Sequence, residues 1–444
     1  MKFTVNKSDI TEAVSNIQRA VSTKTSIPAL EGILLSATET GLELCAYDLE
    51  LGITTVIPAF VMEPGKAVLS AKLFSDIVRR TPAETVTVSV DEKNMATLES
   101  GYSRFSIIGI PAEEFPELPK LSDSTQISLP GALLKSMIRQ TLFAIAESDA
   151  KPIHQGSLFS LENGILDVVS VDGYRLAVRR EPVDFSEDLS FVVPGKTLSE
   201  LLKLIKDSEE PVEISAGRRH ILFKIDNYTV ISSLLEGEFL NYKAAIPPES
   251  QTEVVLKTRE AIDSVERVSL LITDRLKSPI RCLFDNNEVK LNCTTSMGRA
   301  SDQLDVEMTG QSVEIGFNNR YLLEALRNTE CDEVKVQLGG PLSPMKVVPK
   351  EGNSFLFLVL PVRLKREYTG TGFRFVPKAT ACATRHAALK LSGLVDTGGQ
   401  AKMLIQEGHV LVGGEPCPLR GKKLYPGDSF SLGDREFQVA RAEG

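Results

Sequence analysis

The chain has 444 residues, 42% of them hydrophobic and 25% charged, which is ordinary for a globular protein and too long for one hydrophobic core. No apolar run reaches the length of about 18 residues that a membrane helix needs, and the N-terminus lacks the apolar stretch of a signal peptide. We therefore expect a cytoplasmic protein of two to four domains that has no membrane contact.

The sequence opens with the alternating apolar residues Phe3 and Val5, a pattern that predicts a β-strand. A helix is predicted next, at about 7–20, followed by alternating strands over 32–57. A second helix around 72–78 and more strands over 84–110 complete this set. The period-two alternation is typical of half-buried antiparallel strands, so we predict an α+β fold.

The same order of elements then returns at an offset of 124 residues. The offset aligns the second-helix segments, in which basic, apolar and acidic positions match: KLFSDIV (72–78), KTLSELL (196–202) and RYLLEAL (320–326). First helices are predicted again at about 131–146 and 257–272, and the offset aligns Val14, Ile138 and Ile262. Several elements in register indicate a threefold repeat.

Proline-rich joints, 110–121 and 246–250, separate the repeats. We therefore predict three domains of one kind at 1–122, 123–247 and 248–366. The offset also aligns Asp48 with Asp172, but the third repeat has Ser296 at this position. An acid that is lost from one repeat favours a turn or strand-end role over a catalytic one.

Catalytic and metal-binding patterns are not found. The sequence has no glycine-rich phosphate loop and no nucleophile elbow. Its six cysteines form no CxxC pair, and its four histidines do not stand at zinc-ligand spacing from them. We therefore expect free thiols in a reducing compartment, no metal, no cofactor, and no catalysis by residues 1–366.

Charge divides the chain at about residue 365. Residues 365–444 contain 12 basic and 8 acidic side chains, a balance of +4, whereas residues 1–364 contain 38 and 51, a balance of −13. A change of sign between two parts of a chain suggests an added module with its own partner.

Over residues 1–366 the chain resembles the beta subunit of bacterial DNA polymerase III, the sliding clamp. The most specific motifs are DGYRLAV (172–178), EIGFNNRYLLEAL (314–326), SPM (343–345) and LPVRL (360–364). The resemblance implies a non-enzymatic processivity factor with the DNA clamp fold, which closes as a head-to-tail homodimeric ring around duplex DNA.

The resemblance also implies a groove that accepts linear peptides from the DNA polymerase III alpha subunit, the clamp loader and repair proteins. Its expected residues are Gly173, Tyr174, Arg175, Leu176, Pro247, Asn318, Tyr321, Ser343, Pro344, Met345, Val359, Leu360, Pro361, Val362, Arg363 and Leu364. Three positions depart from the family pattern, namely His154, Leu240 and Val362, so the peptide preference stays open.

Basic residues on or beside the predicted helices would face DNA phosphates without reading bases. The expected set is Lys24, Lys72, Arg79, Arg80, Lys135, Arg139, Lys196, Lys203, Lys206, Arg259 and Arg320. Any single member could equally be a solvated surface residue.

The tail resembles the alpha-L RNA-binding domain of a small-subunit ribosomal protein and of pseudouridine synthases. After a linker at 367–383, the domain at 384–444 is predicted to contain helices at about 384–392 and 400–408 and a VLVGGE hairpin. The residues expected to contact structured RNA are Arg385, Lys390, Lys402, Arg420, Lys422 and Lys423.

Two alternatives stay open at this point. The tail could contact protein instead of RNA, and RNA binding could be the main role of the chain, with the clamp body as a scaffold.

Overall fold

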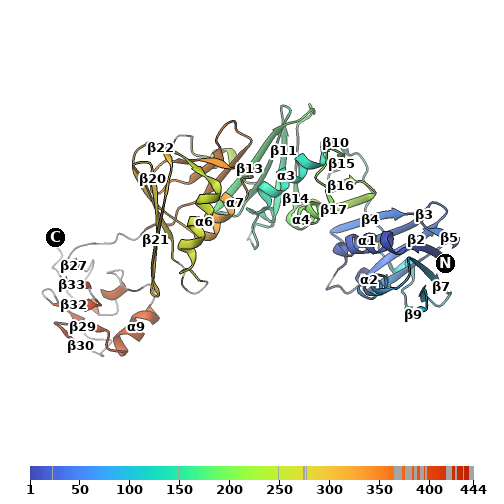
Figure 1. The fold of residues 1–444 in the computed structure, drawn as a ribbon, viewed down its shortest axis with the longest axis horizontal. Helices are drawn as coiled ribbons and strands as arrows, with labels where there is room; N and C mark the ends of the chain where they lie inside the picture. The colour runs from blue at the N-terminus through green and yellow to red at the C-terminus, as the bar shows by residue number, and fades with distance from the viewer. Residues whose placement is uncertain are drawn as a thin grey trace. The chain divides into compact units, whose positions relative to one another are not determined.

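The structure is a computed structural model that divides into two compact units, Met1–Val362 and Arg363–Gly444 (Figure 1). It describes residues 1–364 except 23, 149–150, 249, 274–275 and 277. In the rest of the chain it describes 373–375, 383–384, 388–390, 395, 398–416, 423–425, 428–433 and 435–439.

The first unit contains three repeats, and repeat 1 shows their plan. A strand leads into a helix, four or five strands follow, and a second helix precedes three more strands. The helices and strands are β1 (Lys2–Asn6), α1 (Lys7–Ile17), β2 (Gly32–Thr38), β3 (Gly41–Tyr47), β4 (Leu51–Ile57), β5 (Phe60–Glu63), β6 (Gly65–Ser70), α2 (Ala71–Arg80), β7 (Thr85–Val90), β8 (Met95–Ser100) and β9 (Ser103–Ile108).

Repeat 2 follows the same plan. Its elements are β10 (Thr125–Pro130), α3 (Gly131–Leu142), β11 (Gly156–Glu162), β12 (Ile165–Val171), β13 (Arg175–Pro182), β14 (Leu189–Pro194), α4 (Gly195–Leu204), β15 (Pro211–Ala216), β16 (His220–Ile225) and β17 (Tyr228–Ser233). A short helix, α5 (Tyr242–Ala245), lies in the joint to repeat 3.

Repeat 3 ends the first unit. It comprises β18 (Thr252–Lys257), α6 (Thr258–Ser269), β19 (Ile280–Asp285), β20 (Glu288–Thr295), β21 (Gly298–Asp305), β22 (Glu307–Gly310), β23 (Val313–Phe317), α7 (Asn319–Arg327), β24 (Glu333–Leu338), β25 (Met345–Pro349) and β26 (Phe355–Val359). Short 3-10 turns, such as Pro28–Glu31 and Pro152–Gln155, precede the second strand of repeats 1 and 2.

In each repeat, a pair of helices packs against antiparallel strands, and the hydrophobic core lies between them. The two helices of each repeat pack against each other, as α6 and α7 do in Figure 1. Each first helix turns one apolar face inward; in α1 that face is Ile10, Ala13, Val14 and Ile17. The strands alternate between buried and exposed side chains, as in β7, so one face of each sheet covers the helices.

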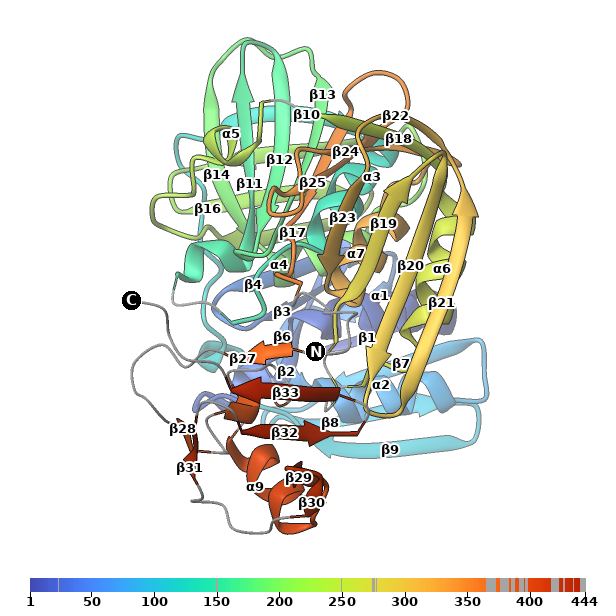
Figure 2. The same ribbon diagram turned by 90° about the vertical axis from the view of Figure 1, so that its left-hand side faces the viewer.

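The repeats are joined by strand pairing across their boundaries. Strand β17 of repeat 2 pairs with β4 of repeat 1, which makes one sheet of eight strands. Strand β26 of repeat 3 pairs with β13 of repeat 2, which makes one sheet of nine strands. The counterparts at the two ends, β9 and β21, each stand at the edge of a sheet, and Figure 2 shows β21 at the margin beside β20.

The predicted threefold repeat is confirmed, with one correction. The second helices begin at Ala71, Gly195 and Asn319, which is the predicted offset. The first helix of repeat 3 begins at Thr258, three residues later than that offset places it. Ile138 therefore corresponds to Val265 and not to Ile262. The connection from α6 to β19 is shorter by the same amount, a change that periodicity within a helix cannot reveal.

The second unit has its own small core, built around Leu389, Ile405 and Phe430. Its elements are β27 (Phe373–Phe375), β28 (Ala383–Thr384), helical residues 388–390, α9 (Gly398–Gln406), β29 (Val410–Val412), β30 (Glu415–Pro416), β31 (Lys423–Leu424), β32 (Ser429–Leu432) and β33 (Arg435–Val439). The predicted VLVGGE hairpin is confirmed: β29 pairs with β30, and Gly413 and Gly414 have φ of +60° and +85°.

Two predictions for the tail are wrong in part. Phe373–Phe375, predicted as linker, pairs in parallel with β33, since aromatic residues favour strands. Thr384, predicted to begin a helix, is in β28, which pairs with Lys423–Leu424. The threonine-rich segment 367–372 lies outside the described residues.

Candidate partner-binding site and DNA-facing helices

Asp172 shapes the turn between β12 and β13. Its Oδ1 accepts hydrogen bonds from the backbone N–H groups of Tyr174 (2.9 Å) and Arg175 (3.0 Å). Gly173 has a φ of +86°, in the left-handed region that glycine adopts without strain. The turn leaves the Tyr174 ring 60% exposed.

The aligned Asp48 forms the same turn in repeat 1. Its Oδ1 accepts from the backbone N–H groups of Glu50 (3.0 Å) and Leu51 (2.7 Å). The predicted turn role of this acid is therefore confirmed.

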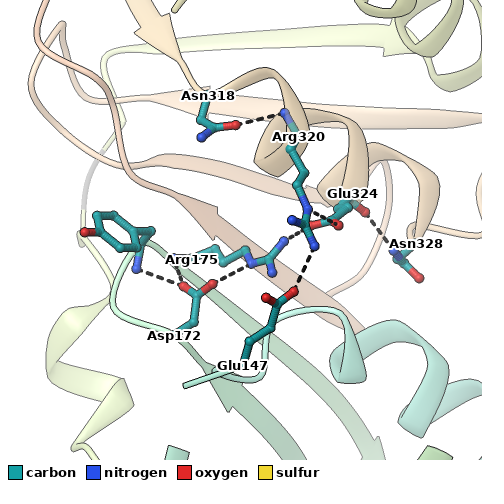
Figure 3. A network of polar contacts seen from close by, with 8 residues as sticks. Glu147, Asp172, Arg175, Asn318, Arg320, Glu324 and Asn328 are labelled. Atoms are coloured by element: carbon teal, nitrogen blue, oxygen red, sulfur yellow. Dashed lines mark hydrogen bonds and ion pairs between the residues drawn. The ribbon is translucent and has the colours of Figure 1, made fainter. Parts of the chain in front are cut away.

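Arg175 is the centre of the contacts between repeats 2 and 3 (Figure 3). Its Nε donates to Asp172 Oδ2 at 2.8 Å, and its guanidinium forms an ion pair with Glu324 of α7. The guanidinium also lies over the rings of Tyr321 and Phe143, at 4.7 and 5.7 Å from their centroids. Arg175 is only 5% exposed, so it holds the two repeats together and presents little surface to a ligand.

The same network continues along α7. Arg320 donates to Glu147 of repeat 2 at 3.0 Å and to Glu324 at 3.2 Å. The side chain of Asn318 caps the helix by accepting from the backbone N–H of Arg320. Figure 3 shows these side chains converging from both repeats. They fix the position of α7 beside β13.

Apolar side chains lie exposed next to this network. The rings of Tyr174 and Tyr321 stack at 5.9 Å, and burial raises the pKa of Tyr321. The backbone N–H of Leu360 donates to the Tyr174 carbonyl at 2.9 Å, which holds the chain after β26 against the turn. The Leu360 and Val362 side chains are each 38% exposed. An aromatic and aliphatic surface on a rigid base is suited to bulky apolar side chains of a peptide.

The remaining predicted groove residues divide by exposure. Leu176, Met345 and Val359 are buried, whereas Pro247, Ser343, Pro344 and Pro361 are half-buried. Arg363 is exposed and Leu364 half-buried, and both follow Val362, the last residue of the first unit.

The joint that supplies Pro247 is anchored by a buried acid. Asp167 accepts two hydrogen bonds from Arg180 and one from the Tyr242 hydroxyl, all at 2.7 Å. These bonds raise the pKa of Arg180, and burial together with the Asp167 bond raises that of Tyr242. The Pro247 carbonyl accepts from the buried Lys346 Nζ at 3.1 Å.

Sequence reasoning missed several residues of this site. Phe143 and Lys346 were not predicted, because one follows a helix and the other lies in a strand without a motif. Of the departures from the family pattern, His154 packs edge-on against Phe239 with 5.5 Å between centroids, and Leu240 is 41% exposed.

Most cations of the predicted DNA-facing set carry a carboxylate partner. The pairs are Lys135–Asp207, Arg139–Glu330, Lys196–Asp48, Lys203–Glu200, Lys206–Asp226, Arg259–Asp263 and Arg320–Glu147. Lys24, Lys72, Arg79 and Arg80 have no ion pair with the carboxylates that the structure describes. The set is therefore not electrostatically uniform.

In the tail, Lys390, Lys402 and Lys423 are exposed. Arg385, Arg420 and Lys422 lie outside the described residues. Exposed Met403 and Tyr425 occur in the same unit, at 53% and 55%.

No group of three or more potential metal ligands occurs among the residues that the structure describes. Burial raises the pKa of the Cys45 and Cys282 thiols to about 12, which keeps both protonated and unreactive at neutral pH. No described helix is long and apolar enough to cross a membrane.

Comparisons with known proteins agree with this architecture. Family models of the DNA polymerase III beta subunit match its N-terminal domain at residues 1–119, its central domain at 128–241 and its C-terminal domain at 243–363. An S4 domain model matches residues 386–440.

The chain is 32% identical over 377 residues to the beta sliding clamp of Bacillus subtilis, with 82% of this chain and 100% of the relative covered. The crystal structure of a Bacillus subtilis DNA polymerase sliding clamp superposes with a TM-score of 0.80 at 31% identity, covering 82% of this chain and all of that one. A DNA polymerase III beta subunit from Eubacterium rectale gives 0.78 at 34% identity, covering 82% and 99%.

The fold is thus that of a sliding clamp with an added S4 domain. The chain belongs to the DNA polymerase III beta subunit family.

Proposed function

We propose that two copies of this chain close head to tail into a ring around duplex DNA. The observation that carries this proposal is the pairing at the two internal boundaries. Each boundary uses the last strand of one repeat and the β4-type strand of the repeat before it. The end strands β9 and β21 are the unpaired counterparts, so β9 of one protomer can pair with β21 of its partner.

Exposed apolar side chains support the same contact. Phe143 follows helix α3 and packs edge-on against Phe357 of repeat 3, with 5.2 Å between centroids. Leu270 follows α6 in the same way and is 81% exposed. Phe357 is the third residue of β26, and its counterpart in β9 is Phe105, which is 39% exposed. Leu270 and Phe105 would cover each other in the ring.

The internal boundaries also specify a register for the ring contact. The first residue of β17, Tyr228, lies opposite Thr55, and the first residue of β26 lies opposite Arg179. The strands β19–β21 follow repeat 2 at an offset of 123, so Thr55 and Arg179 both correspond to Asp302 of β21. The first residue of β9 is Ser103. Both boundaries therefore predict that Ser103 lies opposite Asp302 of the partner protomer.

Engineered cysteines test this register. Ser103→Cys with Asp302→Cys should form a covalent dimer under mild oxidation, because directly opposed Cα atoms lie about 4.5–5.5 Å apart. Ser103→Cys with Ala300→Cys is the matched control, since diagonal neighbours lie about 7–8 Å apart, beyond disulfide reach. Non-reducing electrophoresis reads the result. Linkage of the control pair alone would refute the register.

We further propose that the ring is a processivity factor without catalysis of its own, with domains at 1–122, 123–247 and 248–366. The surface formed by Tyr174, Tyr321, Leu360 and Val362 would bind linear peptides from the DNA polymerase III alpha subunit, the clamp loader and repair proteins. The rigid Arg175 network below it supports this role, because a fixed base reduces the ordering cost of binding.

For the tail we propose binding of structured RNA, which the S4 match and the +4 balance support. Lys402→Glu with Lys423→Glu should weaken binding of a structured RNA at least about tenfold at low salt and reduce the salt dependence. Fluorescence anisotropy measures both effects, and the dimer should persist in sedimentation. If the full chain ignores RNA at low salt, protein contact becomes the better account of the tail.

A further inference from the structure

Helix α2 of repeat 1 carries three exposed cations without an acidic partner. Lys72, Arg79 and Arg80 form no ion pair with any carboxylate that the structure describes. Arg79 donates a 3.2 Å hydrogen bond to the Ser75 hydroxyl. Asp76 stands one turn from Lys72 on the same helix, and the two form no ion pair.

The corresponding cations of repeat 2 are paired. Lys196 contacts Asp48, Lys203 contacts Glu200 at 2.8 Å, and Lys206, just beyond α4, contacts Asp226 at 2.8 Å. In repeat 3, Arg320 contacts Glu147 and Glu324, and Arg327 contacts Glu266 at 2.6 Å. The second helices thus share their cations but differ in the acids around them.

Sequence positions explain the difference. Lys196 pairs with Asp48, which belongs to the preceding repeat. In a closed ring, the repeat that precedes repeat 1 is repeat 3 of the partner protomer. The residue at this position there is Thr295 and not Ser296, which the sequence offset had aligned, because the Thr295 hydroxyl accepts from the Met297 N–H as Asp172 does from Tyr174. Closure therefore brings no acid to Lys72 at this position. Arg80 has Leu204 and Asn328 as counterparts, so it is an extra charge that repeats 2 and 3 lack.

A paired cation binds phosphate less well than a free one. It must give up or share its carboxylate, and that carboxylate repels the phosphate. We infer that the DNA inside the ring is held mainly by Lys72, Arg79 and Arg80 of helix α2, and not evenly by the helices of all three repeats. This inference rests on the proposed ring around DNA and adds where the duplex is held.

Two matched triple variants of the full chain test the inference. One is Lys72→Gln/Arg79→Gln/Arg80→Gln, and the other is Lys196→Gln/Lys203→Gln/Lys206→Gln. Both remove three exposed cations, so they change net charge equally. The probe is a short fluorescent linear duplex, measured with excess covalently closed circular DNA. The circle cannot thread a closed ring and occupies binding sites outside the hole, including those of the tail.

The α2 variant should lose about tenfold or more in affinity, and its log K against log salt slope should fall by about 2–3. The repeat 2 variant should lose less than about threefold, with a nearly unchanged slope. Equal losses, or a larger loss in the repeat 2 variant, would overturn the inference and leave the ring intact as a proposal. If the unmodified chain shows no salt-dependent binding to the linear duplex, both the inference about α2 and the proposed ring around DNA would be overturned.

Discussion

Leu270→Asp should convert the dimer into monomers at micromolar concentration. Leu270 is 81% exposed in the single chain and would be covered by Phe105 of the partner in the ring. Burying an unpaired carboxylate in place of an apolar contact should cost about 3 kcal/mol or more at each junction. A head-to-tail ring has two such junctions, so the loss counts twice. Analytical ultracentrifugation over a concentration series measures the change.

Ile165→Asp is the matched control for this variant. Ile165 is 41% exposed in β12, away from β9 and β21, so its substitution should leave the dimer unchanged. If Leu270→Asp remains a dimer at nanomolar concentration, the assignment of the ring contact is wrong.

Tyr174→Ala with Leu360→Ala should weaken binding of a clamp-binding peptide at least about 100-fold, or about 2.7 kcal/mol. Both side chains are exposed, and a backbone hydrogen bond from the Leu360 N–H to the Tyr174 carbonyl joins the two residues. The backbone makes that bond, so truncating the side chains removes contact area and leaves the support in place. A synthetic peptide from the DNA polymerase III alpha subunit is the probe, with calorimetry as the readout.

Two further variants make this result specific. Tyr425→Ala removes an equally exposed ring from the tail, and peptide affinity should not change. Arg175→Ala should also weaken peptide binding, but for another reason. It leaves Asp172 and Glu324 without their cation, so thermal unfolding should also occur earlier, an effect that Tyr174→Ala with Leu360→Ala should lack. Unchanged affinity of the Tyr174 and Leu360 double variant would contradict the proposed site.

Much of the fold could be predicted from sequence because the pattern of each helix and strand recurs in three repeats. The helix starting at Ala71 was recoverable because basic, apolar and acidic positions recur at Gly195–Leu204 and Asn319–Arg327. The start of α6 was misaligned because the change in spacing occurs in a connection, where no periodicity exists. The strand at Phe373–Phe375 was missed because its pairing partner, β33, lies about 60 residues away.

The site was harder to predict than the fold. The turn role of Asp172 followed from its alignment with Asp48, since an acid shared by two repeats and lost from the third favours a turn role over a catalytic one. The contact of Arg175 with Phe143 and Glu324 joins three separate segments, and no local pattern signals it. The ion pairs of the helix cations could not be predicted either, because partners such as Lys196 and Asp48 are far apart in sequence.

Retention on DNA of defined topology tests the central claim most directly. The chain should be loaded onto nicked circular DNA by the clamp loader of its own organism with ATP and then separated from free protein by gel filtration. We predict that the ring stays on the circle and is released within minutes when a restriction enzyme linearises it, because contacts to phosphate alone do not stop sliding. A chain that remains bound to the linear DNA at physiological salt, or that never co-elutes with the circle, would contradict the account.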